Sequence, residues 1–234
     1  MTRSLDTKRE LWVERLGVMP YAQALDFQRE AAKARISGAI PEDVLLLVEH
    51  PAVVTLGRSA KEQHLLASPQ LLAKRGVELF EVERGGDVTF HGPGQLVGYP
   101  IMPITDVVAY LRTMEDAIVA ALAEEGISAG PREGLTGVWV EDRKIGSIGV
   151  HVSRGVTTHG FAINVDNDLQ PFEWVVPCGL DGVRMTSITK ETGKGDHLDC
   201  FRRRMALAFC TAFGRRQRLV TPERLEAAAV PSAV

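Results

Sequence analysis

The segment RGGDVTFHGPGQ, residues 84–95, is the part of the sequence on which the prediction of the fold depends most. It contains four glycines, one proline and several polar side chains within twelve residues. Glycine turns near each end of the segment favour a hairpin, which composition alone supports. The segment also suits a ligand site, because glycines let backbone N–H groups face a bound molecule while Arg84, His91 and Gln95 orient it. It lacks the GxxxxGK[ST] and GxGxxG signatures, so nucleotide binding has little support.

The composition is that of an ordinary soluble enzyme: 45% of the 234 residues are hydrophobic, 24% are charged, and the net charge is -3. A chain of this length buries roughly 70% or more of its unfolded surface, so one core needs no cross-links. Near-neutral charge argues against a general nucleic-acid binder. No apolar run approaches the roughly 18–20 residues that span a bilayer, and residues 1–12 lack the apolar centre of a secretion signal. We therefore expect a cytoplasmic protein with neither membrane nor nucleic acid as a partner.

Helical and extended segments alternate irregularly, which predicts a mixed α/β (α+β) domain. The hydrophobic spacing predicts helices over residues 20–37, 68–76, 107–122 and 198–212, and a short helix after residue 221. It predicts strands over residues 44–48, 53–56, 77–82, 137–140, 144–152 and 156–165. Since no linker interrupts the pattern, we expect one catalytic domain over residues 1–234. Its core would be roughly residues 10–215, and residues 216–234 would form a C-terminal tail with the short helix.

Three cysteines make a low, odd count that does not suggest a disulfide framework. Cys178 lies between a proline and a glycine, which indicates a turn that could expose the thiol and aim the next backbone N–H at an oxyanion. Without a motif, a small buried packing residue is the more common interpretation, and we keep it for Cys200 and Cys210. No cysteine pair and no HxxxH or HExxH spacing indicates a metal site, and no GxSxG indicates a serine hydrolase.

Lys144 begins a predicted strand, where a lysine is usually a solvated strand end. Gly146 and Gly149 follow it and leave room for a ligand beside the backbone. In the next predicted strand the small residues Gly160 and Ala162 alternate with large ones, so this face also admits a ligand close to the backbone.

The charge is uneven along the chain. Residues 184–218 contain nine Lys or Arg and three Asp or Glu, a net charge of about +6, which leaves about -9 elsewhere. A solvated helix surface is one explanation. A docking surface for an acidic protein is the other.

Four more segments accompany residues 84–100, RGGDVTFHGPGQLVGYP. They are LGRSAKEQHLL (56–66), GVWVEDRKIGSIGVHV (137–152), THGFAINV (158–165) and VPCGLDGVRMTSI (176–188). Together, over roughly residues 10–215, these segments resemble the lipoate-protein octanoyltransferase family of the biotin/lipoate protein ligase superfamily. The resemblance implies a single domain with a larger and a smaller mixed β-sheet flanked by helices.

The resemblance also implies an activity and a site. The family transfers an octanoyl group from octanoyl-acyl carrier protein to a lysine of a lipoyl domain through a Cys/Lys dyad, which corresponds here to Cys178 and Lys144. The expected acceptors are lipoyl domains of 2-oxoacid dehydrogenase E2 subunits and the glycine cleavage H protein, and neither a cofactor nor a metal is expected. The family's acyl pocket corresponds to Arg84, Gly85, Gly86, Asp87, Val88, Thr89, Phe90, His91, Ser147, Ile148, Gly149, Gly160, Phe161 and Ala162. Where many members carry Ala-Ala after the Lys-Ile pair, this chain has Gly146 and Ser147, which implies altered packing of the pocket.

Three other functions remain open at this stage. An ATP-dependent lipoate or biotin protein ligase would form an acyl-adenylate and would not need Cys178. A non-catalytic lipoyl-domain or acyl-carrier binding protein would be free to lose Cys178 or Lys144. A thioesterase would differ only in admitting water to the acyl-enzyme.

Overall fold

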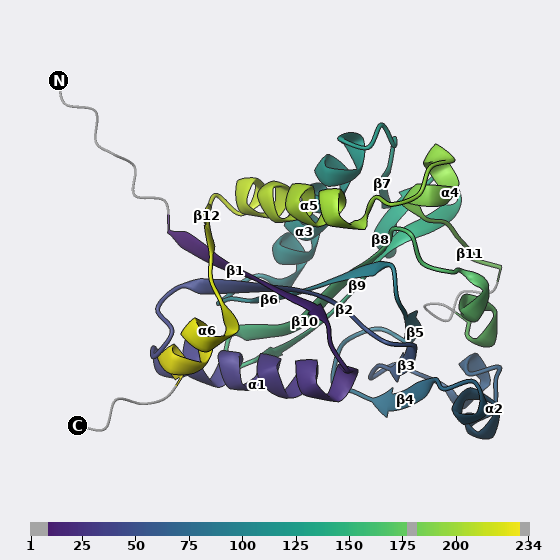
Figure 1. The fold of residues 1–234 in the computed structure, drawn as a ribbon, viewed down its shortest axis with the longest axis horizontal. Coiled ribbons are helices and arrows are strands. Elements are labelled where there is room, and N and C mark those ends of the chain that lie inside the picture. Colours follow the sequence, from purple (N-terminus) through teal and green to yellow (C-terminus); the bar gives the residue numbers. More distant parts are fainter. Residues whose placement is uncertain (1–8, 177–181, 230–234) are drawn as a thin grey trace.

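A computed structural model describes residues 9–176 and 182–229 as a mixed α/β domain with one large and one small β-sheet (Figure 1). The strands of the large sheet follow the order β12-β1-β2-β6-β10-β9-β8-β7, and β11 pairs with β9. Their bounds are β1 Glu10–Val18, β2 Asp43–Glu49, β6 Gln95–Ile101, β7 Gly130–Arg132, β8 Leu135–Val140, β9 Arg143–Ser153, β10 Val156–Asn164, β11 Arg184–Met185 and β12 Arg216–Leu219. The small sheet has the order β4-β3-β5, with β3 Val53–Leu56, β4 Glu78–Glu81 and β5 Val88–His91.

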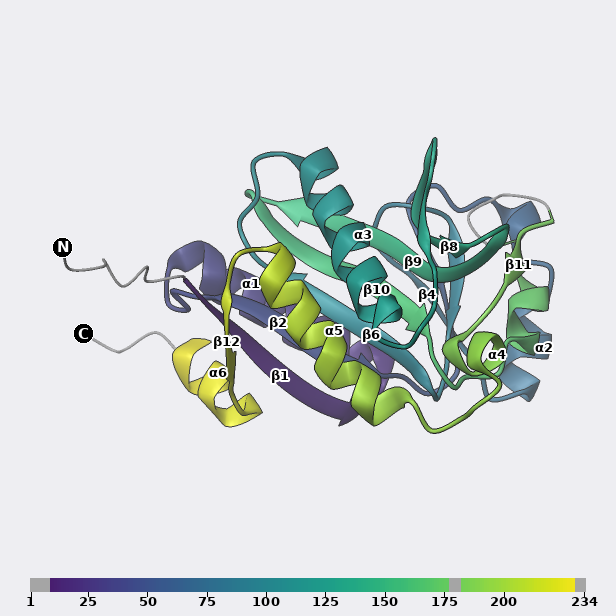
Figure 2. The ribbon, with the colours of Figure 1, turned by 90° about the horizontal axis from the view of Figure 1, so that it is seen from above.

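Helices cover both faces of the large sheet (Figures 1 and 2). Their bounds are α1 Tyr21–Ser37, α2 Pro69–Lys74, α3 Val107–Ala123, α4 Ile188–Thr192, α5 Leu198–Ala212 and α6 Pro222–Ala229, with 3₁₀ turns at Glu62–His64 and Gln170–Trp174. One core cluster joins α3 and α5 to one face of the sheet, and another joins α1 and α6 to the opposite face. The large sheet, which supplies part of the site described below, is therefore covered by helices on both faces.

Local sequence signals explain where the helices begin and end. Asp106 begins α3 by accepting a hydrogen bond from the backbone N–H of Ala109, and Ser68 does the same for Leu71 in α2. Gly38 ends α1 in the left-handed conformation. The predictions of α1, α2, α3, α5 and α6, and of strands β2, β3, β4, β8, β9 and β10, are confirmed within small shifts of their ends.

The hairpin interpretation of residues 84–95 is wrong. β5 pairs with β3 in the small sheet, whereas β6 lies between β2 and β10 in the large sheet. The turn at residues 92–94 therefore carries the chain from one sheet to the other. Gly94 has φ 84°, and a Cβ there would lie 2.7 Å from the backbone nitrogen of Asn167, so this crossing requires glycine.

Helix α4 and strands β1, β7, β11 and β12 were not predicted from the sequence. Residues 216–219, which were predicted to belong to the tail, pair in parallel with β1, and α6 contacts α1. Within the described residues, no helix has both the length and the apolar character needed to cross a membrane.

Candidate active site

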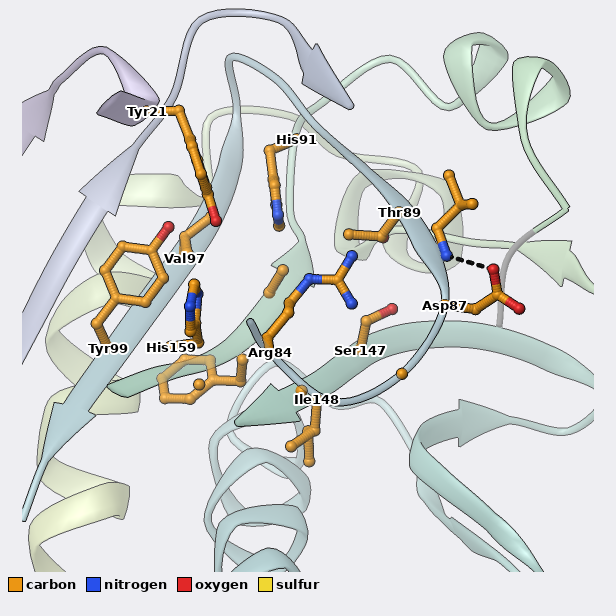
Figure 3. A pocket seen from close by; sticks show the side chains of 16 residues that line it. Tyr21, Arg84, Asp87, Thr89, His91, Val97, Tyr99, Ser147, Ile148 and His159 are labelled. Carbon is orange, nitrogen blue, oxygen red and sulfur yellow. Dashed lines mark hydrogen bonds between the residues drawn. The ribbon is translucent and has the colours of Figure 1, made fainter. Parts of the chain in front are cut away.

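A narrow pocket lies between the large and the small sheet (Figure 3). The empty space between its lining atoms is about 500 Å³, part of which is open to solvent. The lining residues are Tyr21, Arg84, Gly86, Asp87, Val88, Thr89, His91, Val97, Tyr99, Ser147, Ile148, Gly149, His159, Gly160, Phe161 and Ala162. The pocket thus gathers side chains and backbone from α1, β5, β6, β9, β10 and the turn before β5.

The lining includes most of the expected pocket residues but not all of them. Gly85 instead ties its turn to β9, because its backbone N–H donates to the carbonyl of Val150 at 2.9 Å. Phe90 packs edge-to-face against Phe172 and Trp174 in the core of the small sheet. Gln95, expected to orient a ligand, is buried and does not line the pocket.

Arg84 is held at the centre of the pocket by backbone and hydroxyl acceptors (Figure 3). Its Nη2 donates to the carbonyl oxygen of Thr55 at 2.7 Å and to the Thr55 hydroxyl at 2.8 Å, and its Nη1 donates to the carbonyl of Gly85 at 3.1 Å. The residue is 8% exposed. Because several acceptors fix a planar guanidinium, Arg84 presents its charge in one orientation.

Two glycines make the walls of the pocket thin. A Cβ on Gly149 would lie 2.7 Å from the carbonyl oxygen of Gly85, and a Cβ on Gly160 would lie 2.2 Å from that of Gly98. No side chain fits at either position while the neighbouring backbone stays in place. The small face predicted for residues 156–165 therefore serves close packing of backbone as well as access for a ligand.

Neutral aromatic side chains cluster at one side of the pocket, around Tyr21, His91, Tyr99 and His159 (Figure 3). Burial lowers the pKa of His91 to about 3 and that of His159 to about 4. Burial also raises the pKa of Tyr21 to about 12. These groups are uncharged near pH 7, so this side of the pocket suits an uncharged ligand.

Hydrogen bonds below the pocket fix the orientation of this cluster. His50, whose pKa is lowered to about 4 by burial, donates from Nδ1 to the carbonyl of Met19. Its Nε2, 2.7 Å from the Tyr99 hydroxyl, therefore accepts that proton. His91 Nδ1 lies 2.7 Å from Gln95 Oε1. The role of Gln95 is thus to orient His91.

Sequence reasoning missed Tyr21, Val97, Tyr99 and His159 as lining residues. Tyr21 reaches the pocket from α1, which no local pattern connects with it, whereas Val97 and Tyr99 lie within the segment 84–100 but outside the expected pocket residues. His159 is a non-glycine residue with φ 55° inside a strand, and nothing in the sequence marks that conformation.

Lys144 is a buried residue, so the solvated strand end suggested by its sequence position is wrong. It is 1% exposed, and every other lysine among the described residues is exposed. Its Nζ donates to the carbonyl oxygen of Thr136 at 3.3 Å and lies 5.3 Å from the centroid of the Trp139 ring. Lysines are almost never fully buried unless they are paired, so this buried lysine is uncommon.

An irregularity in the pairing of β8 and β9 directs Lys144 towards the pocket side of the sheet. Val138 pairs with Gly146 and Trp139 with Lys144, so Ile145 is an extra residue on β9. In a regular strand, residues 144 and 147 would point to opposite faces. With the bulge, Lys144 shares the face of Ser147, which lines the pocket.

Cys178 lies outside the described residues. The described chain before it is anchored at Val176, whose N–H donates to the carbonyl of His64 at 2.8 Å. His64 Nδ1 in turn lies 2.6 Å from Oδ2 of Asp87, which lines the pocket. The described chain after it pairs with β9 at Lys144, where the Thr186 N–H donates to the Lys144 carbonyl at 2.9 Å.

The other two cysteines differ from each other. Cys210 is buried in the core, and burial raises the pKa of its thiol to about 11. Its predicted packing role is confirmed. Cys200 is exposed on α5, so the packing interpretation is wrong there.

The basic stretch, residues 184–218, is largely compensated by intramolecular ion pairs. Its pairs are Arg184–Asp142, Arg202–Glu49, Arg202–Asp199, Arg204–Glu124, Arg204–Glu125, Arg215–Asp43, Arg216–Glu10 and Arg218–Glu10. The side chain of Arg202 is only 13% exposed. Much of the excess of +6 is therefore met within the fold, while Lys190, Lys194 and Arg203 are exposed, and docking of an acidic carrier protein on this stretch stays a prediction. Among the described residues, no group of three or more His, Cys, Asp or Glu is arranged to hold a metal ion.

The two-sheet fold is that of lipoate protein ligases. A bi-partite lipoate protein ligase from Thermoplasma acidophilum, solved in work that includes its E2 lipoyl domain, superposes with a TM-score of 0.73 at 21% identity. The match covers 94% of this chain and 91% of that one. At this identity the likeness establishes the fold alone.

The sequence matches identify the family. The family model of the lipoyl protein ligase A/B catalytic domain matches residues 20–210, and the chain belongs to this family. The chain is 48% identical to an octanoyltransferase of Acidobacterium capsulatum, over 75% of this chain and 78% of the relative. It is 45% identical to an octanoyltransferase of Chloroflexus aggregans, over 89% of this chain and 97% of the relative.

Proposed function

We propose that this chain is an octanoyltransferase of protein lipoylation, which moves an octanoyl group from octanoyl-acyl carrier protein to a lysine of a lipoyl domain. Relatives of that name at 45–48% identity support the reaction class. The single observation that carries the catalytic assignment is Lys144, a buried ammonium on the pocket face of β9. The proposed acceptors are lipoyl domains of 2-oxoacid dehydrogenase E2 subunits and the glycine cleavage H protein.

The pocket supports an acyl ligand. Its aromatic and imidazole groups are neutral near pH 7, and its walls at Gly149 and Gly160 are bare backbone, which suits a slender uncharged chain. We assign octanoyl binding to the predicted residues that line the pocket, together with Tyr21, Val97, Tyr99 and His159. We assign contact with the polar end of the acyl group to Arg84, because it is the one lysine or arginine among the described lining residues.

The proposed chemistry has two half-reactions. The thiolate of Cys178 attacks the octanoyl thioester, a tetrahedral oxyanion collapses, and the carrier thiol leaves with a proton, giving a Cys178 thioester. The lysine amine of the lipoyl domain then attacks this thioester. An amide forms, the C–S bond breaks, and the proton lost by the amine returns to Cys178. No ATP enters, because the donor is already a thioester.

Lys144 would assist both half-reactions. An unperturbed thiol is only about 3% ionised at pH 7, and a neighbouring ammonium favours the thiolate. In the second half-reaction, Lys144 would relay the proton between the incoming amine and the departing thiolate. Described residues on either side of 177–181 are tied to the pocket residue Asp87, through His64, and to Lys144, which supports this pairing.

Intact mass spectrometry after mixing with octanoyl-acyl carrier protein tests the proposal. We expect the native chain to gain one octanoyl group, Cys178→Ala to gain none, and the matched control Cys200→Ala to be acylated normally, since Cys200 is an exposed thiol on α5. Lys144→Ala should lower turnover by at least about 100-fold. Full activity of Cys178→Ala would refute the thioester mechanism.

The same assay separates this function from that of an ATP-dependent ligase. We expect transfer from the carrier protein in the absence of ATP. Transfer only from free octanoate or lipoate with ATP would refute the proposal in favour of a ligase.

A further inference from the structure

One buried carboxylate lies close to Lys144 without touching it. Glu115 on α3 is 1% exposed, in a helix whose other buried residues are Tyr110, Met114, Ala117, Ile118, Ala121 and Leu122. A buried carboxylate is costly unless hydrogen bonds and opposite charge compensate it. Its presence among apolar neighbours therefore calls for an explanation that packing of α3 does not supply.

The hydrogen bonds of Glu115 supply that explanation. Its Oε1 accepts from the backbone N–H of Gly137 at 2.8 Å, and its Oε2 pairs with Arg112, whose side chain is half exposed. The N–H of Gly137 and the carbonyl of Thr136 belong to one peptide group. That carbonyl accepts from Lys144 Nζ at 3.3 Å. One peptide unit thus joins a buried carboxylate to a buried ammonium.

The surrounding backbone leaves this peptide little freedom. Gly137 has φ 127°, and a Cβ there would lie 2.6 Å from the carbonyl oxygen of Gly146 and 2.8 Å from Lys144 Cε. The peptide therefore packs directly on the lysine side chain. On its other side, α3 packs against β8, so Glu115 fixes the peptide from the helix layer.

We infer that Glu115 is a positioning residue for the proposed reaction: through the peptide between Thr136 and Gly137, it holds the ammonium of Lys144 in place. A hydrogen bond to a carboxylate polarises the peptide and strengthens its carbonyl as an acceptor. The ring of Trp139 lies 5.3 Å from the same ammonium and adds a cation–π contact. The inference rests on the proposed catalytic role of Lys144.

Two substitutions separate the hydrogen bond of Glu115 from the volume of its side chain. Glu115→Gln keeps an oxygen that accepts from the Gly137 N–H, whereas Glu115→Leu has a similar size and accepts nothing. Misplacement of a catalytic group by about 1 Å can cost about 100-fold in rate. We expect Glu115→Leu to lower kcat for octanoyl transfer at least tenfold with KM for the lipoyl domain unchanged. We expect Glu115→Gln to recover kcat to within about threefold of the native value.

Glu14 provides the matched control, since it is another buried glutamate, 4% exposed, on β1 between Trp12 and Leu16, which pack in the core cluster of α1 and α6. Glu14→Gln and Glu14→Leu should keep native kcat, and unfolding midpoints of all four variants should be measured in parallel. Three results would overturn the inference: Glu115→Leu with native kcat, Glu115→Gln no faster than Glu115→Leu, or equal kcat losses in the Glu14 variants.

Lys144→Ala, measured in the same assay, separates a failure of the proposed role of Lys144 from a failure of the positioning role of Glu115. Native activity of Lys144→Ala would contradict the proposed role of Lys144 and overturn the positioning role with it. An inactive Lys144→Ala together with a fully active Glu115→Leu would contradict the positioning role alone.

Discussion

Two glycines on β9, Gly146 and Gly149, should respond in opposite ways to the same added methyl group. In Gly149→Ala, the new Cβ would lie 2.7 Å from the carbonyl oxygen of Gly85, which is 0.7 Å inside the 3.4 Å at which ordinary contact begins. The obstacle is the backbone of Gly85, whose N–H donates a hydrogen bond to the carbonyl oxygen of Val150 at 2.9 Å. The turn that carries Arg84 must therefore move away from β9.

Two contributions make up the loss of stability that this movement of the turn causes. Overpacking of this kind costs about 1–3 kcal/mol, and loss of the hydrogen bond to Val150 adds about 1 kcal/mol. For a protein of this size we expect Tm to fall by about 4–10 °C. Because the displaced turn bears Arg84 and Gly86 of the pocket, acylation by octanoyl-acyl carrier protein should slow at least tenfold.

Gly146→Ala is the matched control on the same strand. Its Cβ would meet the side chains of Val138 at 3.4 Å and Ile118 at 3.6 Å, which are ordinary contacts. Replacing glycine where the backbone permits it stabilises a protein by about 0.4–1 kcal/mol, through the unfolded chain. Thermal unfolding and single-turnover acylation of both variants test this pair. A Gly149→Ala variant as stable as the native chain, or a Gly146→Ala variant whose free energy of unfolding is lower by more than about 1 kcal/mol, would contradict this pair of predictions.

Three other predictions concern stability. Burial raises the pKa of Glu14 from 4.5 to about 7, so the folded chain holds a proton that the unfolded chain releases, and stability falls as pH rises from about 4.5 to 7. Glu14→Gln should remove this decline and, in urea unfolding, be about 3 kcal/mol more stable than the native chain at pH 8 but not at pH 4. Asp43 is 2% exposed and accepts hydrogen bonds from Arg35 and Arg215. Asp43→Ala should therefore lower the free energy of unfolding by about 3–5 kcal/mol in the same assay, and a loss below about 1 kcal/mol would contradict the stabilising role of these pairs. Arg202→Glu should lower Tm, because it breaks the ion pair with Glu49 and places two carboxylates side by side, while KM for the carrier protein at low salt stays unchanged. A raised KM with native Tm would instead support docking of the carrier protein at Arg202.

Much of the fold could be predicted from local patterns. The hydrophobic spacing over residues 107–122 and the cap at Asp106 specify α3 without reference to the rest of the chain, since helical periodicity and capping act over a few residues. Most of the pocket was predicted as well, because its residues come from a few contiguous segments that resemble one family.

What the local patterns missed depends on contacts between distant segments. Composition at residues 92–94 suits a hairpin and a sheet-to-sheet crossing equally, and only the pairing of β6 with β2 and β10 decides between them. Strand β12 exists because β1 offers it an edge 206 residues away in the sequence, between Glu10 and Arg216. Most ion pairs of the basic stretch are likewise made with acids on other elements.

The sequence by itself determined every described helix except α4, about half of the described strands, the family, and Lys144 as a candidate catalytic residue. Each of these depends on neighbours along the chain. Only the tertiary structure decided what surrounds Lys144. A one-residue bulge turns it to the pocket face, and the peptide that receives its hydrogen bond is fixed by Glu115, 29 residues earlier in the chain. Burial converts these contacts from weak, solvent-screened interactions into ones that fix a charge in place, and burial is a property of the packed chain.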